Sequence, residues 1–188
     1  MKILINALGA NMGGAIRHLT NFLPQLGKVD SEREYVVLVR DTIPEITVAK
    51  NLHIERLPDA QAGNWRKRLF GDVISLPMRL KKEGFSATVS LLNVGPIWSS
   101  VPHILFQRNA LYFCDYFLEH ISGRRKIETL LRRKLALASM KRADVIVTPS
   151  NAMADMIRHS TGKLGDKNFL TLYHGFDVNT LNQRIDKA

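Results

Sequence analysis

Cysteine and long hydrophobic runs are nearly missing from this sequence. Its 188 residues contain one cysteine, Cys114, which excludes an internal disulfide and a metal site made of clustered cysteines. No apolar run approaches the roughly 20 residues that a membrane-spanning helix needs. The start of the chain does not resemble a secretory signal either, because the apolar run 3–5 ends at Asn6, short of the about 7–15 apolar residues required. We therefore expect a protein of the reducing cytoplasm.

Sequence signatures of several enzyme classes are also missing. The six histidines have no spacing typical of metal ligands, and no H-E-x-x-H sequence occurs, so no metal is expected. There is no G-x-S-x-G sequence for a hydrolase nucleophile and no Walker A loop. Cys114 lies among aromatic residues, which favours a packing role over a nucleophilic one. The sequence therefore leaves the catalytic residues unknown.

Positive charge is what the sequence has in excess. The formal net charge is +10, although the 45% hydrophobic and 23% charged residues are ordinary for a globular domain. Such a charge predicts an anionic partner: nucleic acid, an anionic membrane surface or a phosphorylated small molecule. A solvated helix face explains the charge equally well. The basic residues gather at Arg66-Lys67-Arg68, Lys81-Lys82, Arg124-Arg125-Lys126, Arg132-Arg133-Lys134 and Lys141-Arg142.

Short apolar runs alternate with segments of helical periodicity. The apolar runs predict seven strands, at 2–8, 34–40, 52–57, 85–92, 103–107, 143–148 and 168–173. Strands that are largely apolar and separated by helices are typical of a parallel sheet covered on both faces. The predicted fold class is therefore α/β, with a Rossmann-like, doubly wound, mostly parallel sheet and helices on both faces.

The first two helical segments contain proline. Residues 16–26 have apolar side chains at helical spacing, but Pro24 is expected to kink or shorten this helix, and Gly27 to end it. The segment 65–82 is helical in pattern, with a break expected at Pro77.

The two later helices have clearer limits. A long basic helix is predicted over 124–141. The last helix is expected to begin at Ser150, a good N-cap residue, and to end at Gly162.

Glycines precede the first predicted helix, at a place where open α/β sheets bind ligands. Gly13 and Gly14 lead directly into that helix, so free backbone N–H groups and the helix dipole would face an anion. Arg17, one turn further on, would add charge to the same place. A tight turn is the alternative explanation for the glycines, and their loop lacks the G-x-G-x-x-G spacing of dinucleotide-binding proteins.

Polar residues also follow two of the other strands. Arg108 and Asn109 come directly after the strand 103–107. An arginine there can clamp a phosphate or sugar hydroxyls, or it can form a salt bridge at the sheet edge. Asp41 follows the strand 34–40, where an acidic side chain could hold a ribose.

Three segments of the chain match a known family in order and separation. The chain opens with Met-Lys-Ile-Leu-Ile-Asn and continues with Gly-Gly-Ala-Ile-Arg-His at 13–18. Later come Ala-Asp-Val-Ile-Val-Thr-Pro-Ser at 143–150 and Tyr-His-Gly-Phe-Asp at 173–177. Together these segments resemble the N-terminal domain of the retaining GT-B glycosyltransferases of family 4, and the resemblance covers essentially the whole chain.

The resemblance implies an acceptor-side glycosyltransferase domain at 1–177, with 178–188 as the start of an interdomain linker. The substrate would be a nucleotide diphosphate sugar, and no cofactor or metal is implied. A C-terminal donor-binding domain, outside this sequence, would hold most of that substrate and supply the family's glutamate pair, so the chain alone is expected to be inactive. Gly13, Gly14 and Arg17 would then face the donor phosphates. The residues expected to line the acceptor cleft are Asn93, Arg108, Asn109, Ser150, His174 and Gly175.

Two positions depart from the family pattern. Leu92-Asn93 stands where the family commonly has histidine or another polar pair, and His174 stands where asparagine usually precedes the glycine. These departures weaken the transfer of cleft roles to Asn93 and His174.

The expected partners follow from the resemblance and the charge. They are the donor-binding domain, a sugar or lipid-linked acceptor of polysaccharide biosynthesis, and an anionic membrane surface, which would place the protein in the cytoplasm or at the inner membrane face. No specific nucleic acid is expected, because basic and aromatic residues are not interleaved. Two other interpretations stay open: a Rossmann-like nucleotide-binding domain of another enzyme class, and a noncatalytic subunit of a transferase made of two polypeptides.

Overall fold

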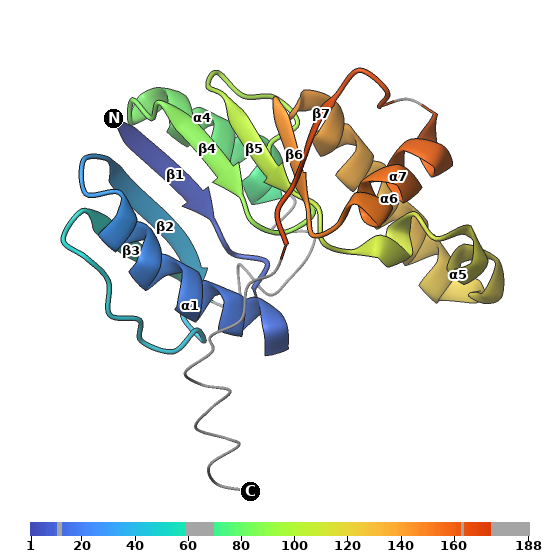
Figure 1. The fold of residues 1–188 in the computed structure, drawn as a ribbon, viewed down its shortest axis with the longest axis horizontal. Helices are drawn as coiled ribbons and strands as arrows, with labels where there is room; N and C mark the ends of the chain where they lie inside the picture. The colour runs from blue at the N-terminus through green and yellow to red at the C-terminus, as the bar shows by residue number, and fades with distance from the viewer. Residues whose placement is uncertain (11–12, 59–69, 163, 174–188) are drawn as a thin grey trace, which may run out of the picture.

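Seven parallel strands form one open sheet in a computed structural model that describes residues 1–10, 13–58, 70–162 and 164–173. The strand order is β3-β2-β1-β4-β5-β6-β7, so the first strand lies inside the sheet, between β2 and β4 (Figure 1). All neighbouring strands are parallel, which confirms the predicted fold class. The strands are β1 (Lys2–Asn6), β2 (Glu34–Arg40), β3 (Leu52–Leu57), β4 (Ala87–Ser90), β5 (His103–Phe106), β6 (Val145–Thr148) and β7 (Asn168–Thr171).

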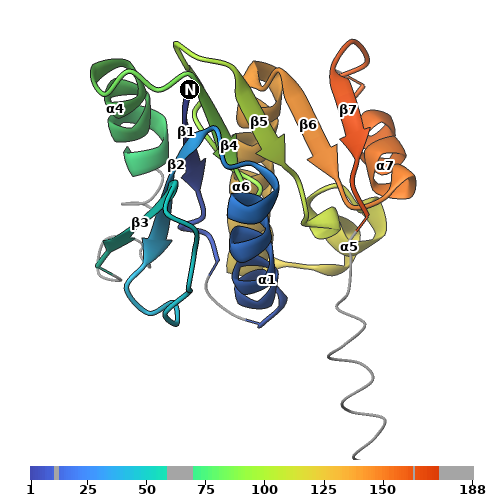
Figure 2. The same cartoon turned by 60° about the vertical axis from the view of Figure 1, so that its left-hand side comes forward.

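Helices cover both faces of the sheet, but unequally. The helix α1 (Gly13–Val29) lies on one face, and the later helices lie on the other (Figures 1 and 2). The alternation of side chains along the strands separates the two cores: Ile5 packs with α1, while Leu4 packs with the later helices. The elements of the second face are η1 (Gly71–Ser75), α4 (Leu76–Lys82), α6 (Gly123–Arg142) and α7 (Asn151–Thr161).

Burial along the strands follows their place in the sheet. In β2, which has a neighbour on each side and helices near both faces, every residue after Glu34 is buried. The edge strand β7 instead alternates between exposed and half-buried residues, and Leu170 remains exposed. Strands covered on both faces need continuous apolar sequence, which is the pattern that predicted β2 correctly from Glu34 to Arg40.

The helix α1 extends beyond its predicted end. Pro24 lies inside the helix, and Gly27 does not end it, because α1 continues to Val29. Gly27 is buried, and a Cβ atom at this position would lie 2.6 Å from the Cβ of Ala49. The glycine therefore allows close approach of the loop that carries Ala49. The prediction of a helix stop at Gly27 was wrong because tertiary packing explains the residue.

The prediction of a helix over 65–82 is confirmed for its later part, while 65–69 lie outside the described residues. The five-residue π-helix η1 passes directly into α4, and Pro77 lies in the first turn of α4. Because η1 precedes it without interruption, Pro77 lies inside a continuous helical segment, where its missing N–H removes one backbone hydrogen bond. The expected break at Pro77 is thus a change of helix type.

Two short elements after β5 were not predicted. They are η2 (Ala110–Tyr112), a 3-10 turn, and α5 (Asp115–His120), which has six residues. Helices this short show no usable periodicity in sequence. The last helix, α7, has the predicted limits: Ser150 is its N-cap, and Gly162 ends it with a left-handed φ of 55°.

Candidate functional site

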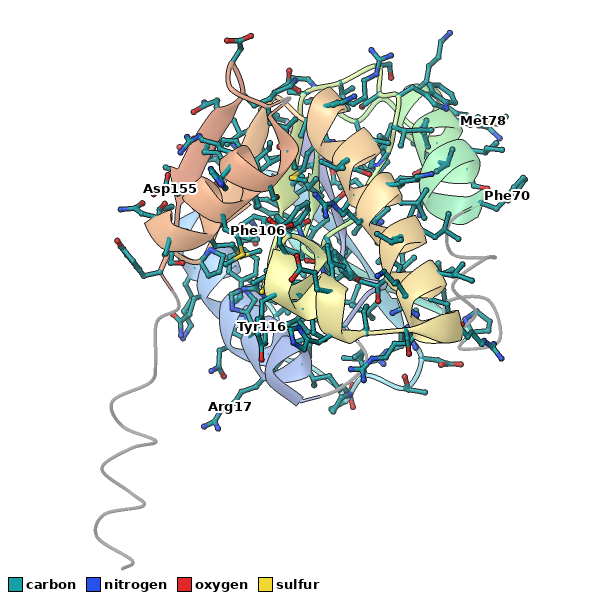
Figure 3. The ribbon with its side chains drawn as sticks, turned by 90° about the vertical axis from the view of Figure 1, so that its right-hand side faces the viewer. Arg17, Phe70, Met78, Phe106, Tyr116 and Asp155 are labelled. Atoms are coloured by element: carbon teal, nitrogen blue, oxygen red, sulfur yellow. The ribbon has the colours of Figure 1, made fainter. Side chains whose placement is uncertain are left out.

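The start of α1 is open at the carboxyl end of β1. Gly13 has a φ of 52°, a conformation that favours glycine, and a Cβ atom at either Gly13 or Gly14 would meet nothing within 4 Å among the described residues. The first turn of α1 contains no acidic residue. Unpaired N–H groups and the positive end of the helix dipole at such a terminus attract anions. Arg17 is exposed and points away from the body of the protein in Figure 3.

Asn93 joins the ends of β4 and β5. Its Oδ1 accepts hydrogen bonds from the backbone N–H groups of Arg108, at 2.8 Å, and Asn109, at 2.9 Å. The backbone N–H of Asn93 donates to the carbonyl of Phe106 at 2.8 Å. Asn93 adopts a left-handed φ of 56°, which asparagine tolerates better than most residues. The structure thus brings three predicted cleft residues together, with the Oδ1 of Asn93 holding the backbone of the other two.

Arg108 is half-buried at this junction. Its guanidinium carbon lies 5.8 Å from the centre of the Phe106 ring, and burial lowers the pKa of Arg108 from its ordinary value. A partly desolvated guanidinium interacts more strongly with an anion than one in bulk water, because the local dielectric constant is lower.

Two predicted cleft residues use their side chains locally. The Oγ of Ser150 accepts from the N–H of Met153 at 3.2 Å, and the Oδ1 of Asn109 accepts from the N–H of Leu111 at 3.1 Å. These bonds cap α7 and η2 and use one lone pair of each acceptor oxygen, so the Ser150 hydroxyl and the Asn109 amide can still donate to a ligand. Contact of either residue with a ligand stays a prediction. His174 and Gly175 lie outside the described residues.

Buried polar residues below this edge were not identified from the sequence. The Nδ2 of Asn6 donates to the Oδ1 of Asp72 at 2.7 Å, which links the end of β1 to η1. Gln107 is fully buried, and its Oε1 has no hydrogen-bond partner among the described residues. Their position in the sequence could have identified them, because Asn6 and Gln107 are polar residues at the ends of apolar runs that predict buried strands.

A second buried polar group lies beneath the loop that connects β4 and β5. The Nε2 of His103 lies 3.0 Å from the Oγ of Ser90, and burial lowers the pKa of His103 to about 4. Ser139 of α6 donates to the carbonyl of Gly95 at 2.8 Å and accepts from its N–H at 3.1 Å. A neutral, fully enclosed histidine of this kind is a structural element of the loop and does not reach a substrate.

The described part of the chain holds no group of three or more His, Cys, Asp or Glu residues that could bind a metal ion. No helix within the same ranges is both long enough and apolar enough to cross a membrane.

Comparison with known proteins finds similarity in structure only. No protein-family model matches the chain, and no curated protein does. Among solved structures, it is similar to a UGT transferase from Siraitia grosvenorii in complex with UDP, with a TM-score of 0.54 and 11% identity over 99% of this chain and 54% of that one. It is also similar to a UDP-glucose: anthocyanidin 3-O-glucosyltransferase in complex with UDP, with a TM-score of 0.51 and 14% identity over 99% and 57% of the two chains.

A third similar structure is a sucrose-phosphate synthase from Thermosynechococcus elongatus, with a TM-score of 0.50 and 10% identity over 100% of this chain and 96% of that one. The chain therefore spans about half the length of the first two proteins. At these identities the likeness concerns the fold, which is shared with enzymes that transfer sugars.

Proposed function

We propose that this chain is the N-terminal, acceptor-side domain of a glycosyltransferase that uses a nucleotide diphosphate sugar. The observation that carries the proposal is the open glycine start of α1 at the carboxyl edge of the sheet, with no acidic residue in its first turn. The shared fold with sugar transferases, two of them in complex with UDP, supports the same function. The sequence resemblance adds that transfer is retaining and that the transferred group is a hexosyl unit.

The chemistry assigned to this edge is stabilisation of a departing diphosphate. When a nucleotide diphosphate leaves the sugar, negative charge develops on its phosphate oxygens, and preorganised donors lower the barrier. In the proposal, the N–H groups at Gly13 and Gly14 face these oxygens, and Arg17 adds positive charge from the same helix. Arg108 serves the phosphate or sugar hydroxyls from the β5 side. No metal is required for this step.

The proposal places the remaining parts of the reaction elsewhere. The donor sugar and nucleotide are held mainly by a second, C-terminal domain, which also brings the catalytic carboxylates. The sugar or lipid-linked acceptor binds on the side of Asn93 and Arg108. We therefore expect negligible transferase activity from this chain alone when it is assayed with a panel of sugar nucleotides. Robust turnover would contradict the assignment of donor binding and of the catalytic carboxylates to a second domain.

Nucleotide binding tests the phosphate site directly. We expect weak binding of UDP or GDP and their sugars in calorimetric titrations of the whole chain, together with binding of simple glycans or a lipid-linked acceptor. Gly14→Val should lower the nucleotide affinity by about tenfold, because its side chain fills the space in front of the helix N–H groups. Gly165→Val is the matched control, since a Cβ there also meets nothing within 4 Å.

The competing interpretations give different results in the same titrations. Tight binding of NAD, with no binding of sugar nucleotides or glycans, would indicate a nucleotide-binding domain of another enzyme class. Equal loss of nucleotide affinity in Gly14→Val and Gly165→Val would remove the phosphate role from α1. Activity that is restored by a separately encoded donor domain would identify the chain as one subunit of a two-polypeptide transferase.

A further inference from the structure

The outward face of α6 combines positive charge with exposed aliphatic side chains. The helix contains eight lysines and arginines and one acidic residue, Glu128, which is paired with Arg124 at 2.9 Å. Three large apolar residues of α6 are nevertheless exposed: Ile127 at 68%, Leu130 at 38% and Leu131 at 39%. The outward face of a helix that contacts only water is normally polar, so the exposed apolar residues of α6 need another explanation.

Helical spacing gathers these residues on one side of α6. Leu130 and Leu131 follow Ile127 by three and four positions, so both lie on the same face as Ile127, and Lys134 continues that row. The buried residues of α6 lie on the opposite side, where Ala136 and Met140 pack against the sheet. The exposed aliphatic residues therefore point away from the protein.

A second exposed apolar row runs from Phe70, the N-cap of η1, along η1 and α4. Phe70, Ile74 and Met78 follow one another at intervals of four positions and are exposed at 59%, 39% and 61%. Figure 3 shows Phe70 and Met78 directed outward from this helix. Lys81 and Lys82, both exposed, follow at the end of α4.

The two rows lie on the same face of the sheet. Strand registers connect Leu4, which packs with α4, through Thr88 and His103 to the residues that pack with α6. Both rows therefore lie on the outer side of helices that cover the same face of the sheet. Within η1 and α4, the one acidic residue, Asp72, is buried and bonded to Asn6. Arg79 is paired with Glu55 and Glu83, so the positive charge that α4 offers at this surface comes from Lys81 and Lys82.

We propose that this face, formed by the exposed residues of η1, α4 and α6, docks the protein on an anionic lipid bilayer. Lysine and arginine side chains are attracted to acidic headgroups, and aliphatic side chains between them enter the boundary with the acyl chains. A nucleic acid would use the charge but would leave Ile127, Leu130 and Leu131 in water. The inference does not depend on the proposed transferase function, since it uses none of the residues assigned to the phosphates or the acceptor.

Co-sedimentation of the whole chain with vesicles tests the proposal. We expect binding to vesicles of phosphatidylcholine mixed with phosphatidylglycerol, and little binding to phosphatidylcholine alone. The variant Lys134→Gln with Lys141→Gln should bind about 25-fold more weakly, because each cation near the surface contributes about fivefold. The variant Ile127→Gln with Leu131→Gln keeps all charges and should bind about tenfold more weakly, because less apolar area enters the bilayer.

A control on the other face accompanies these variants. Lys28→Gln with Val29→Gln, at the end of α1, removes one exposed lysine and one apolar side chain that is 86% exposed, and it should bind vesicles like the unmodified chain. Unchanged unfolding midpoints in urea establish that each variant is folded.

Three outcomes would overturn the proposal. The first is no binding to the mixed vesicles at low salt. The second is a loss of binding in the lysine variant with no loss in the aliphatic variant, which would show that charge alone causes the binding and that the aliphatic residues do not enter the bilayer. The third is tight binding to duplex DNA at physiological salt together with absence from vesicles, which would make the basic face a nucleic-acid surface.

Discussion

The Oδ1 atom of Asn93 lies 2.8 Å from the backbone nitrogen of Arg108 and accepts its hydrogen bond. A side chain at the end of β4 thereby fixes the backbone at the end of β5, where the candidate cleft lies. The position of the Arg108 guanidinium depends on this bond, because Arg108 is the second residue after β5.

Substitutions of Asn93 should separate the contribution of its two accepted hydrogen bonds from that of its left-handed backbone conformation. Asn93→Ala loses both accepted hydrogen bonds and places alanine at positive φ, so we expect a loss of about 2–3 kcal/mol in the free energy of unfolding. Asn93→Gly keeps the backbone conformation and should lose less, and Asn93→Asp keeps the acceptor and should lose least. Urea denaturation measures all three, and equal losses would contradict the assignment.

Gly95 should tolerate no side chain. A Cβ atom there would lie 2.3 Å from the Oγ of Ser90 and 2.7 Å from the Nε2 of His103, both in a buried group. We expect Gly95→Ala to lower the free energy of unfolding by about 1–3 kcal/mol, as overpacking of a core usually does. Gly165→Ala, which meets open space, serves as the control in the same denaturation experiment. Equal stability of the two variants would show that the loop can move aside.

Stability should fall in mild acid because of His103. Its pKa is about 4 in the folded protein, below the ordinary 6.5, since burial disfavours the charged ring. The unfolded chain therefore binds the proton first as the pH drops, so the stabilising contribution is complete above about pH 6.5 and is lost toward about pH 4. The full loss is up to about 3 kcal/mol. His103→Gln should be less stable at neutral pH but should lack this pH dependence; an unchanged slope would assign it to other groups.

Arg79 should hold the edge strand β3 to α4. Its guanidinium donates two hydrogen bonds of 2.7 Å to Glu55 of β3 and one of 2.7 Å to Glu83 at the end of α4. We expect Arg79→Gln to cost about 1 kcal/mol and to speed amide hydrogen exchange in β3. Arg124→Gln, which removes an ion pair with a 92% exposed arginine, should cost less than about 0.5 kcal/mol. Equal costs would show that the half-buried position of Arg79 and its pairing with two carboxylates add nothing to stability.

Local signals in the sequence predicted the fold well where the structure depends on neighbouring residues. Ser150 and Gly162 mark the ends of α7 because capping is decided within a few positions of the chain. Gly27 was misinterpreted, since the reason for that glycine is Ala49, which approaches it only in the folded protein.

The candidate site was predictable only in part. The placement of Gly13, Gly14, Asn93, Arg108 and Asn109 at the carboxyl edge was predictable because each follows a predicted strand of a parallel sheet. The hydrogen bonds of Asn93 and the burial of Arg108 could not be predicted, because they depend on how two loops meet. The exposure of the aliphatic residues of α6 could not be predicted either, since sequence alone does not say which side of a helix packs against the sheet.

The inner position of β1 has a consequence for how the protein is made. Ile3 pairs with Ala87 across the β1–β4 boundary, so β1 keeps one edge open until β4 has been synthesised. Contacts between residues so distant in sequence form slowly, and an open strand edge is a template for aggregation. Nascent chains that end before residue 87 should therefore be the ones that need a chaperone. Pairing with β4 then covers the open edge of β1.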